Sequence, residues 1–329
     1  MQKFNLNNFK FSYNVVIEKM DHFYEKKQPF LFIIDFEKKF GYFLLDNFIA
    51  ESGILFAFHE KKNQDKLINF HFESKPIQQS LYESSFQKVK ARIQHGDSYL
   101  TNLSFATPIT TDLSLDEIYT YSNAKYKLLL PDQFVVFSPE RFVYIDDEKI
   151  STNPMKGTSS VENDPKGDLL RSSDKEMAEH FTIVDLMRND LSMVAKNVSV
   201  QRFKYLNLVK SNRSAIWQMS SEIQGIVRSE FKNKIGSLFD RILPAGSISG
   251  APKKRTCEII SEVENYRRGF YTGVFGYFDG IRLDSAVMIR FIEKQNNVLV
   301  FKSGGGITSM SELVQEYDEL NQKIYVPIF

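Results

Sequence analysis

The stretch FYTGVFGYFDGIRLDSAVMIRFIEKQNNVLVFKSGGG, residues 270–306, decides the fold class. Three of its segments predict consecutive strands: FYTGVFGYFDG, SAVMIRFIEK and NVLVFKSGGG. Strands joined by so few residues pair antiparallel, because a parallel crossover needs about a dozen residues or more. A final helix is expected from about Ser311, after the glycines. This order favours an α+β fold of large antiparallel β-sheets packed together, with helices outside.

The rest of the chain continues the same pattern. The first eighty residues predict short aromatic-rich strands, residues 80–95 predict a helix, and two strands are expected to meet at Ser138-Pro139. Residues 157–176 are polar and predict a mobile loop. A helix is expected between Asp174 and Asn197, and its apolar stripe is Met177, Phe181, Val184 and Leu191.

Domain organisation follows from what the chain lacks. No internal repeat and no sharp change of composition divides it, so we expect a single domain over residues 1–329. Its N-terminal part, about residues 1–80, is rich in expected strands.

Composition excludes several classes of protein. Lys and Arg number 42 against 41 Asp and Glu, a net charge of +1, so no basic surface for nucleic acid is expected. No apolar run approaches the roughly 20 residues of a membrane helix, and no secretory leader is visible, so we expect a cytoplasmic protein. Cys257 is the only cysteine, which excludes an internal disulfide and a multi-cysteine metal site.

Two acidic pairs stand out at helical spacing. On the last expected helix, Glu316 and Glu319 run beside the apolar stripe of Leu313, Tyr317, Leu320 and Ile324. Taken alone, this is the pattern of a solvated face with a Glu319–Lys323 ion pair. Glu176 and Glu179 form a second pair on another helix, and carboxylates from two helices are also suited to a hard cation such as Mg²⁺.

Other site motifs are weak or missing. Gly304, Gly305 and Gly306 lie between an expected strand and a helix, where backbone N–H groups can approach an anion, although such triplets are also ordinary turns. The chain contains neither GxGxxG before a helix nor GxxxxGK[ST], so no nucleotide fingerprint is present. An HExxH pair is missing too, which counts against a zinc hydrolase.

Seven segments together resemble the chorismate-utilising enzymes, which include the component I chains of anthranilate synthase and aminodeoxychorismate synthase, and the isochorismate and salicylate synthases. In chain order they are SPERF, NPMKGT, AEHFTIVDLMRNDL, LPAGSISGAPKKRTCEII, RRGFYTGVFGYFD, AVMIRF and GGGITSMSELVQEYDELNQK. The resemblance covers about residues 96–329, the expected catalytic core, and implies a shortened N-terminal part, large antiparallel sheets and Mg²⁺-dependent chemistry on chorismate.

The same resemblance assigns residues. It implies that Glu179 and Glu319 ligate Mg²⁺, with Glu176 and Glu316 behind them or acting through water. For a carboxylate of chorismate it implies the ligands Ser247, Tyr271, Arg290, Lys323 and the backbone of Gly304, Gly305 and Gly306.

Lys156 in NPMKGT selects the branch of the family. Aminodeoxychorismate synthases resemble PIKGT there, whereas the anthranilate, isochorismate and salicylate branches typically carry alanine. The resemblance implies that Lys156 attacks C2 of chorismate, that Glu140 protonates the departing C4 hydroxyl, and that ammonia then displaces the lysine at C4; Thr158 completes the predicted catalytic set. The lysine must react as a free amine, so its ordinary pKa of about 10.4 has to be lowered.

Two positions depart from the family pattern. Leu100 stands where isochorismate and salicylate synthases carry a lysine base, so water activation by that route is not expected. Gln218 stands where a histidine linked to pyruvate elimination is usual, which suits an enzyme that stops at aminodeoxychorismate. Feedback inhibition by tryptophan is not expected either, because no clear counterpart of the tryptophan-site motif occurs in the short N-terminal part.

The resemblance therefore predicts aminodeoxychorismate synthase component I, a transferase that serves 4-aminobenzoate and folate synthesis. Glutamine hydrolysis needs a cysteine nucleophile, and Cys257 lies in a segment matched to the synthase itself, so ammonia is expected from a separate glutamine amidotransferase subunit. The chain ends soon after the last synthase helix, so no fused lyase is expected. The alternatives are anthranilate synthase component I and a non-catalytic scaffold paralogue.

Overall fold

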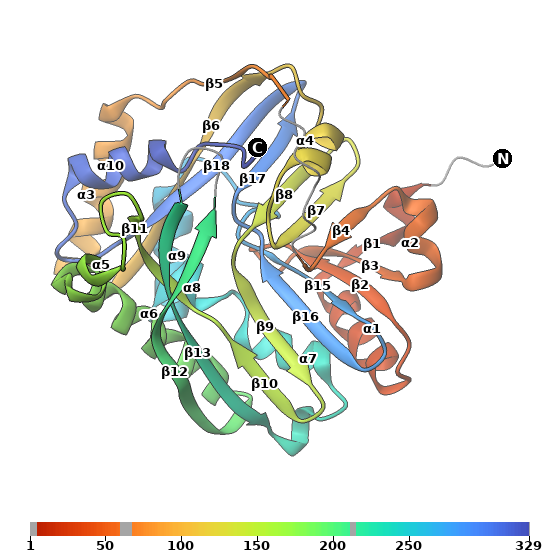
Figure 1. Ribbon diagram of the computed structural model, residues 1–329. Helices are drawn as coiled ribbons and strands as arrows, with labels where there is room; N and C mark the ends of the chain where they lie inside the picture. Colours follow the sequence, from red (N-terminus) through yellow and green to blue (C-terminus); the bar gives the residue numbers. More distant parts are fainter. Residues whose placement is uncertain (1–4, 60–67, 211–214, 329) are drawn as a thin grey trace. The chain divides into compact units, whose positions relative to one another are not determined.

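The computed structural model describes residues 5–59, 68–210 and 215–328. The chain divides into two compact units that alternate along the sequence. Unit 1 comprises Met1–Ser52, Glu140–Ser247 and Val274–Val287, and unit 2 comprises Gly53–Pro139, Ile248–Gly273 and Met288–Phe329. Each unit is built on an antiparallel sheet with helices (Figure 1), which confirms the predicted α+β class. The single domain over residues 1–329 stays a prediction.

The strands of unit 1 form one sheet. They are β1 (Lys10–Ser12), β2 (Phe30–Ile34), β3 (Phe40–Leu45), β9 (Arg141–Asp146), β10 (Lys149–Thr152), β11 (Met155–Ser160), β12 (Ala195–Lys210), β13 (Ala215–Val227), β15 (Val274–Phe278) and β16 (Arg282–Val287). Their spatial order is β1-β3-β2-β15-β16-β9-β10-β13-β11, and β12 also pairs with β13. β10 and β11 therefore share one edge of β13, while β12 pairs with the other edge.

The helices of unit 1 include two in the part of the chain where only strands were expected. The α-helices are α1 (Tyr13–Glu25), α2 (Asp46–Ser52), α5 (Asp168–Ser172), α6 (Asp174–Ser192) and α7 (Ile235–Ile242), and the 3-10 turns are η1 (Leu6–Phe9) and η2 (Ser229–Phe231). Helix α1 was missed although Tyr13, Val16 and Met20 are buried at helical spacing. The one-turn helix α8 (Gly246–Ser249) has residues in both units.

Unit 2 contains the second sheet. Its strands are β4 (Leu55–Ala57), β5 (Phe72–Ser74), β6 (Leu100–Thr111), β7 (Tyr126–Leu130), β8 (Phe134–Ser138), β14 (Gly250–Ala251), β17 (Phe291–Gln295) and β18 (Val298–Ile307). Their order is β14-β6-β18-β17-β8-β7-β4, with β5 beside β6. Its helices are α3 (Gln79–Gln94), α4 (Leu115–Tyr121), α9 (Lys253–Val263) and α10 (Leu313–Gln322).

The chain passes between the two sheets several times, and two of these passages involve strands predicted from the sequence. SAVMIRFIEK was expected to be one strand, but it forms the end of β16 and most of β17, which belong to different sheets. Arg290 has a φ of +54°, a left-handed conformation that ends the extended run. At the other segment, Pro139 separates β8 from β9 as expected, because proline cannot donate to a ladder. Glu140 therefore lies directly before β9.

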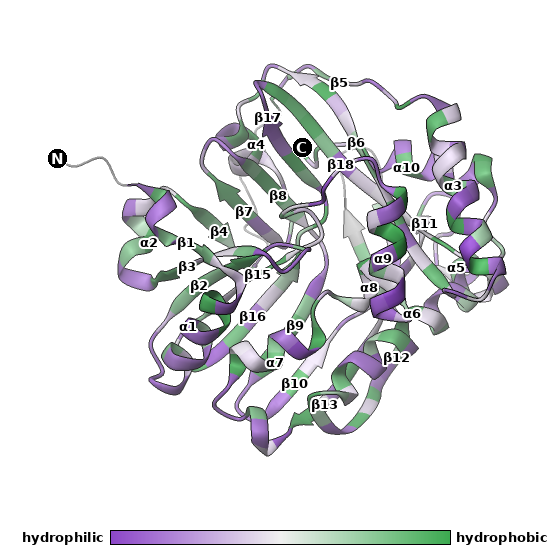
Figure 2. Cartoon of the chain, turned by 180° about the vertical axis from the view of Figure 1, so that it is seen from behind, coloured by the Kyte–Doolittle hydropathy of each residue, from purple (hydrophilic) through white to green (hydrophobic). Residues whose placement is uncertain are grey.

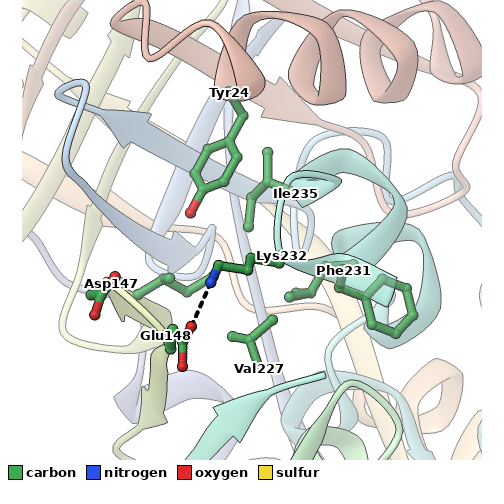
Figure 3. Close-up of a pocket in the computed structure, with 9 residues that line it drawn as sticks. Tyr24, Asp147, Glu148, Val227, Phe231, Lys232 and Ile235 are labelled. Atoms are coloured by element: carbon green, nitrogen blue, oxygen red, sulfur yellow. Dashed lines mark hydrogen bonds and ion pairs between the residues drawn. The ribbon is translucent and has the colours of Figure 1, made fainter. Parts of the chain in front are cut away.

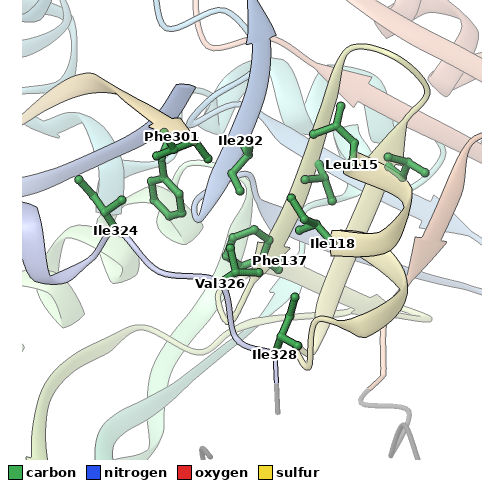
Figure 4. Close-up of a cluster of buried hydrophobic side chains, with 11 residues drawn as sticks. Leu115, Ile118, Phe137, Ile292, Phe301, Ile324, Val326 and Ile328 are labelled. Carbon is green, nitrogen blue, oxygen red and sulfur yellow. The ribbon is translucent and has the colours of Figure 1, made fainter. Parts of the chain in front are cut away.

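Each unit has its own apolar core. In unit 2, Leu115 and Ile118 of α4 pack with Phe137, Ile292 and residues of the C-terminal segment (Figure 4). Helix α9 carries hydrophobic and hydrophilic turns (Figure 2), and its buried Ile259 belongs to a further core cluster in the same unit. In the described part of the chain, no helix is both long and apolar enough to cross a membrane.

Two predictions about the region before and within α6 were wrong. Phe181 is 53% exposed and contacts the ring of Phe203 at a tilted angle, whereas His180 is fully buried. The buried stripe of α6 therefore includes His180 and excludes Phe181. The second is the loop expected over residues 157–176, which contains the end of β11 and all of helix α5. The side chain of Asp164 accepts hydrogen bonds from the backbone N–H groups of Leu169 and Leu170 (3.2 and 3.0 Å), which fixes the start of α5.

Candidate active site

Lys156 lies in a β-bulge of strand β11. Met155 pairs with Ser220 and Thr158 pairs with Gln218, so Lys156 and Gly157 together face a single residue of β13. Gly157 has a φ of +88°, which glycine adopts without strain. Bulges of this kind redirect a side chain out of the regular alternation of a strand. Here the bulge leaves Lys156 Nζ 3.1 Å from Oε2 of Glu179.

Helix α6 brings the first acidic pair to this bulge. Glu179 forms the ion pair with Lys156, and both side chains remain about one third exposed, at 30% and 29%. Glu176 contacts the neighbouring residue: a Cβ atom built on Gly157 would lie 2.8 Å from Glu176 Oε2. Ser173 caps the helix by accepting the N–H of Glu176. Lys156, Glu176 and Glu179 are thus held together within unit 1.

Glu140 has a hydrogen-bonded carboxyl group. The hydroxyl of Ser247 donates to Glu140 Oε1 at 2.5 Å. Burial raises the pKa of Glu140 above its ordinary value, although this hydrogen bond and the positive charge of Lys156 both favour the carboxylate. The side chain keeps some contact with solvent, but the surrounding protein solvates its charged form poorly. A carboxyl group in this environment can hold a proton at a higher pH than an exposed glutamate.

The remaining positions discussed for the catalytic step lie on strands. Thr158 is exposed and pairs with Gln218 across the β11–β13 ladder. Gln218, which stands where a histidine is usual in the family, therefore lies opposite the residue two positions after Lys156. Leu100 begins β6 in unit 2 and is 9% exposed. The catalytic role of Thr158 stays a prediction.

Two buried polar residues of α6 were not predicted. His180 Nε2 lies 2.7 Å from the hydroxyl oxygen of Ser221, and burial lowers the pKa of His180 to about 4, so the ring is neutral at pH 7. Asp190 is 6% exposed and accepts the backbone N–H of Gly246 at 2.9 Å. The sequence pattern that could have identified them as buried is helical spacing, because His180 and Asp190 fall on the same helix face as Met187 and Leu191.

In unit 2 the glycine run is part of a strand. Gly304, Gly305 and Gly306 pair with Ser104, Leu103 and Asn102 of β6, so the expected loop between strand and helix was wrong. The first glycine is needed for space, since a Cβ there would lie 2.7 Å from the carbonyl oxygen of Leu103. On the other edge of β18, the pairing with β17 ends at Lys302, before the glycines begin.

Lys323 connects the glycine run to the last helix. Its Nζ atom donates to the carbonyl oxygen of Gly304 at 2.8 Å and lies 2.6 Å from Oε1 of Glu319. Arg290 donates to the carbonyl oxygen of Lys323 at 2.6 Å. Glu316 is 7% exposed, and its Oε2 lies 3.4 Å from the position of a Cβ on Gly305. The residues predicted for unit 2 are therefore neighbours, and Glu316 does not belong to a solvated face.

Tyr271 is buried next to an ion pair that was not predicted. It is 3% exposed, and burial raises the pKa of its phenol. The backbone carbonyl oxygen of Arg268 accepts the N–H of Tyr271 at 3.2 Å, and the guanidinium of Arg268 donates to Glu264 at 2.6 and 2.9 Å. Arg268 also donates to the carbonyl oxygen of Asn102, the residue opposite Gly306. This pair therefore supports both the turn of Tyr271 and the strand beside the glycine run.

The carboxylates were tested for their fit to Mg²⁺. Among the described residues, no three His, Cys, Asp or Glu side chains form a cluster that could hold a metal ion. Each unit instead supplies two glutamates, one of which faces a glycine. Glu176 faces Gly157, where a Cβ would intrude, and Glu316 faces Gly305, where a Cβ would lie at van der Waals distance. Carboxylate oxygens are ligands that Mg²⁺ prefers. The donor type and these glycine cradles fit the ion.

A separate small pocket lies elsewhere in unit 1. Figure 3 shows it between Tyr24 of α1, the β9–β10 turn and the segment before α7. The ion pair of Lys232 Nζ with Glu148 Oε1, at 2.6 Å, lies at its edge beside apolar side chains. None of the predicted site residues lines this pocket.

The chain is similar in sequence to several known proteins. An uncharacterized PabA-like protein of Haemophilus influenzae is 45% identical over 95% of this chain and 96% of its own length. Aminodeoxychorismate synthase component 1 of Escherichia coli is 33% identical over 74% of this chain and 56% of its own. Anthranilate synthase component 1 of Saccharomyces cerevisiae is 32% identical over 78% of this chain and 53% of its own.

Solved structures show the same fold. The menaquinone-specific isochorismate synthase MenF of Escherichia coli superposes with a TM-score of 0.73 at 16% identity, over 95% of this chain and 82% of the other. Anthranilate synthase component I of Streptococcus pneumoniae gives 0.65 at 28% identity, over 77% and 58%. The sequence profile of the family described as chorismate binding enzyme matches residues 51–328. The chain belongs to the chorismate binding enzymes.

Proposed function

We propose that this protein is aminodeoxychorismate synthase component I, which converts chorismate and ammonia to 4-amino-4-deoxychorismate. Sequence identity does not distinguish aminodeoxychorismate synthases from anthranilate synthases, because the named examples of the two are 33% and 32% identical to the chain. The observation that carries the proposal is the Lys156 bulge, which presents an amine beside Glu179 and within the electrostatic influence of Glu140.

In the first step the neutral amine of Lys156 forms a bond to C2 of chorismate. The ring double bonds shift, the C4–O bond breaks, and Glu140 gives its proton to the departing hydroxyl, which leaves as water. The new secondary amine releases a proton, so the charge balances. A carboxyl group whose pKa is raised by burial is suited to this role because more of it is protonated near neutral pH.

In the second step ammonia forms a bond to C4, the double bonds shift back, and the bond between C2 and Lys156 breaks. One proton passes from the added nitrogen to the departing amine. The net change replaces the 4-hydroxyl with a 4-amino group and produces water. The proposal assigns delivery of ammonia to a separate glutamine amidotransferase subunit, consistent with a chain whose single cysteine, Cys257, is partly buried in α9.

Binding of chorismate is assigned to the neighbouring groups of unit 2. Arg290 and Lys323 supply positive charge, the glycine strand supplies backbone groups, and Tyr271 supplies a phenol that stays protonated. The family resemblance assigns Mg²⁺ to Glu179 and Glu319, with Glu176 and Glu316 behind them or acting through water. When bound, the ion would neutralise a carboxylate of the substrate.

The proposal is tested by intact-protein mass spectrometry of the enzyme with chorismate and Mg²⁺ but without ammonia. Wild-type protein is expected to gain the mass of chorismate minus water, and Lys156→Ala is expected not to. Product analysis with ammonium tests the branch, since aminodeoxychorismate supports the proposal and anthranilate contradicts it. If both proteins make aminodeoxychorismate without an adduct, ammonia attacks directly and the nucleophile is wrong.

A further inference from the structure

Asp190 lies near the C-terminal end of α6 and contacts a distant loop. Its side chain is 6% exposed, and Oδ2 accepts the backbone N–H of Gly246 at 2.9 Å. A buried carboxylate is costly unless it is hydrogen-bonded, and a bond from a backbone N–H to a charged oxygen is among the stronger kinds. The contact therefore ties the first residue of α8 to α6.

The loop can approach this closely because residue 246 is a glycine. A Cβ at Gly246 would lie 2.9 Å from Asp190 Oδ2 and 3.4 Å from its Cγ. Gly246 does not have a positive φ, so the position requires glycine for space rather than for backbone conformation. Asp190 and Gly246 therefore fit each other, although 56 residues separate them in the sequence.

The next residue along the chain is the one that contacts Glu140. Ser247 donates its hydroxyl to Glu140 Oε1 at 2.5 Å, one peptide unit beyond the N–H that Asp190 holds. The position of Ser247 Oγ relative to Glu140 thus depends on where the backbone of Gly246 is fixed. Ser247 from α8 bonds the carboxyl group of Glu140, and Lys156 from β11 acts on it electrostatically. Asp190 reaches Glu140 through the loop that carries Ser247.

We infer that Asp190 is a positioning residue, whose carboxylate fixes the start of α8 so that Ser247 holds the carboxyl group of Glu140 in its reactive orientation. The inference rests on the proposed function for the role of Glu140 as general acid. Orientation matters for such a group, because a displacement of about 1 Å can reduce the rate by about 100-fold. Ser247 then serves Glu140 in addition to any contact it makes with the substrate.

The experiment compares Asp190→Ala, Ser247→Ala and the double variant with wild type. The first readout is the titration of Glu140 followed by NMR in protein with labelled glutamate side chains, and the signal is assigned by its loss in Glu140→Gln. The second readout is kcat with chorismate, Mg²⁺ and ammonium. Asp21→Ala is the matched control, because Asp21 accepts the N–H of Ser237 at the start of α7, at 3.1 Å, in the same unit.

Both single variants are expected to raise the pKa of Glu140, because each removes the hydrogen bond that favours its carboxylate. The double variant should shift it no further than either alone. We expect kcat to fall about tenfold in Asp190→Ala, with near wild-type values in Asp190→Asn, whose amide oxygen still accepts the N–H. Asp21→Ala should leave the titration of Glu140 and kcat unchanged.

An unchanged titration in Asp190→Ala, with a shift in Ser247→Ala, would overturn the inference, and so would additive shifts in the double variant. If Asp190→Ala does not fold, Gly246→Ala replaces it, because its Cβ displaces the same carboxylate, and the same outcomes apply. The proposed function fails separately, if wild-type protein makes no aminodeoxychorismate. The NMR titration would still decide the inference in that case, because it needs no turnover.

Discussion

Lys156 Nζ and Glu179 Oε2 lie 3.1 Å apart, joining strand β11 to helix α6 within unit 1. The pair combines the proposed nucleophile with a proposed ligand of Mg²⁺. Each side chain is about 30% exposed, so solvent screens their attraction and the pair is weak enough to separate. Because one carboxylate serves two cations in the proposal, the ammonium of Lys156 and the metal ion compete for Glu179.

Lys156→Ala is therefore expected to bind Mg²⁺ more tightly than wild type. An exposed ion pair contributes about 0.2–1 kcal/mol, which corresponds to a gain of about 1.4- to 5-fold in affinity. Isothermal titration calorimetry without chorismate measures this directly. Lys166→Ala, which changes an exposed lysine of the same segment, is the control. An unchanged affinity in Lys156→Ala would show that Glu179 is not a ligand.

Glu140→Gln is expected to lower kcat by about 10²–10⁴-fold, the usual contribution of a general acid. In wild type the acid is active when protonated, so activity should fall as the pH rises through its pKa. Burial raises that pKa, which places this limb of the pH–rate profile above the range of an ordinary glutamate. The limb should be absent in Glu140→Gln. Its persistence would assign it to another group.

The same substitution is expected to change stability with the opposite sign to its effect on activity. Because folding raises the pKa of Glu140, the fold favours the protonated form, and that contribution is lost as the pH rises through the folded pKa. Glu140→Gln should therefore raise Tm at pH 8 and leave it unchanged at pH 4. Glu148→Gln is the control for the sign of this change in Tm, because Lys232 lowers the pKa of Glu148 whereas burial raises that of Glu140.

Gly157→Ala is expected to destabilise unit 1 and to weaken Mg²⁺ binding. The φ of +88° costs a non-glycine residue about 1–2 kcal/mol, and the new Cβ would displace Glu176. Gly96→Ala is a matched control, because Gly96 has a φ of +89° and no atom within 4 Å of its Cβ position. Urea denaturation and calorimetry should show a loss of stability in both variants and a loss of metal affinity in Gly157→Ala alone.

Glu319→Gln is expected to reduce Mg²⁺ affinity by more than about tenfold and to reduce activity with it. The carboxylate also pairs with Lys323 at 2.6 Å, so the neutral amide should additionally loosen the contact of Lys323 with Gly304. Asp318→Asn changes an exposed carboxylate on the same helix and should behave as wild type. Full activity and unchanged metal binding in Glu319→Gln would remove this residue from the metal site.

Glu264→Gln tests the buried ion pair of unit 2. Both side chains of the pair are 1% exposed, so removing one charge leaves Arg268 buried and uncompensated. The expected loss is about 3–5 kcal/mol in the free energy of unfolding, measured by urea denaturation. The exposed pair of Asp185 with Arg188 is the contrast, and Asp185→Asn should cost no more than about 0.5 kcal/mol. Equal losses would argue against burial as the cause.

The sequence determined most of the secondary structure and the chemistry of the candidate site. Strand β13 and helix α3 were predicted because side-chain periodicity is a local property. Lys156 was identified from its motif, and Glu140 from its family position. The N-terminal helix α1 was missed, although its apolar spacing was visible in the sequence.

Only the tertiary structure decided which residues contact each other over long sequence separations. The bulge at Lys156 depends on its register with β13, and the glycine run becomes a strand because β6 offers it a hydrogen-bonding edge. The contact of Asp190 with Gly246 and the buried Arg268–Glu264 pair likewise depend on packing. Side-chain pattern records which face of an element is apolar, but burial and partner choice arise only when distant segments pack together.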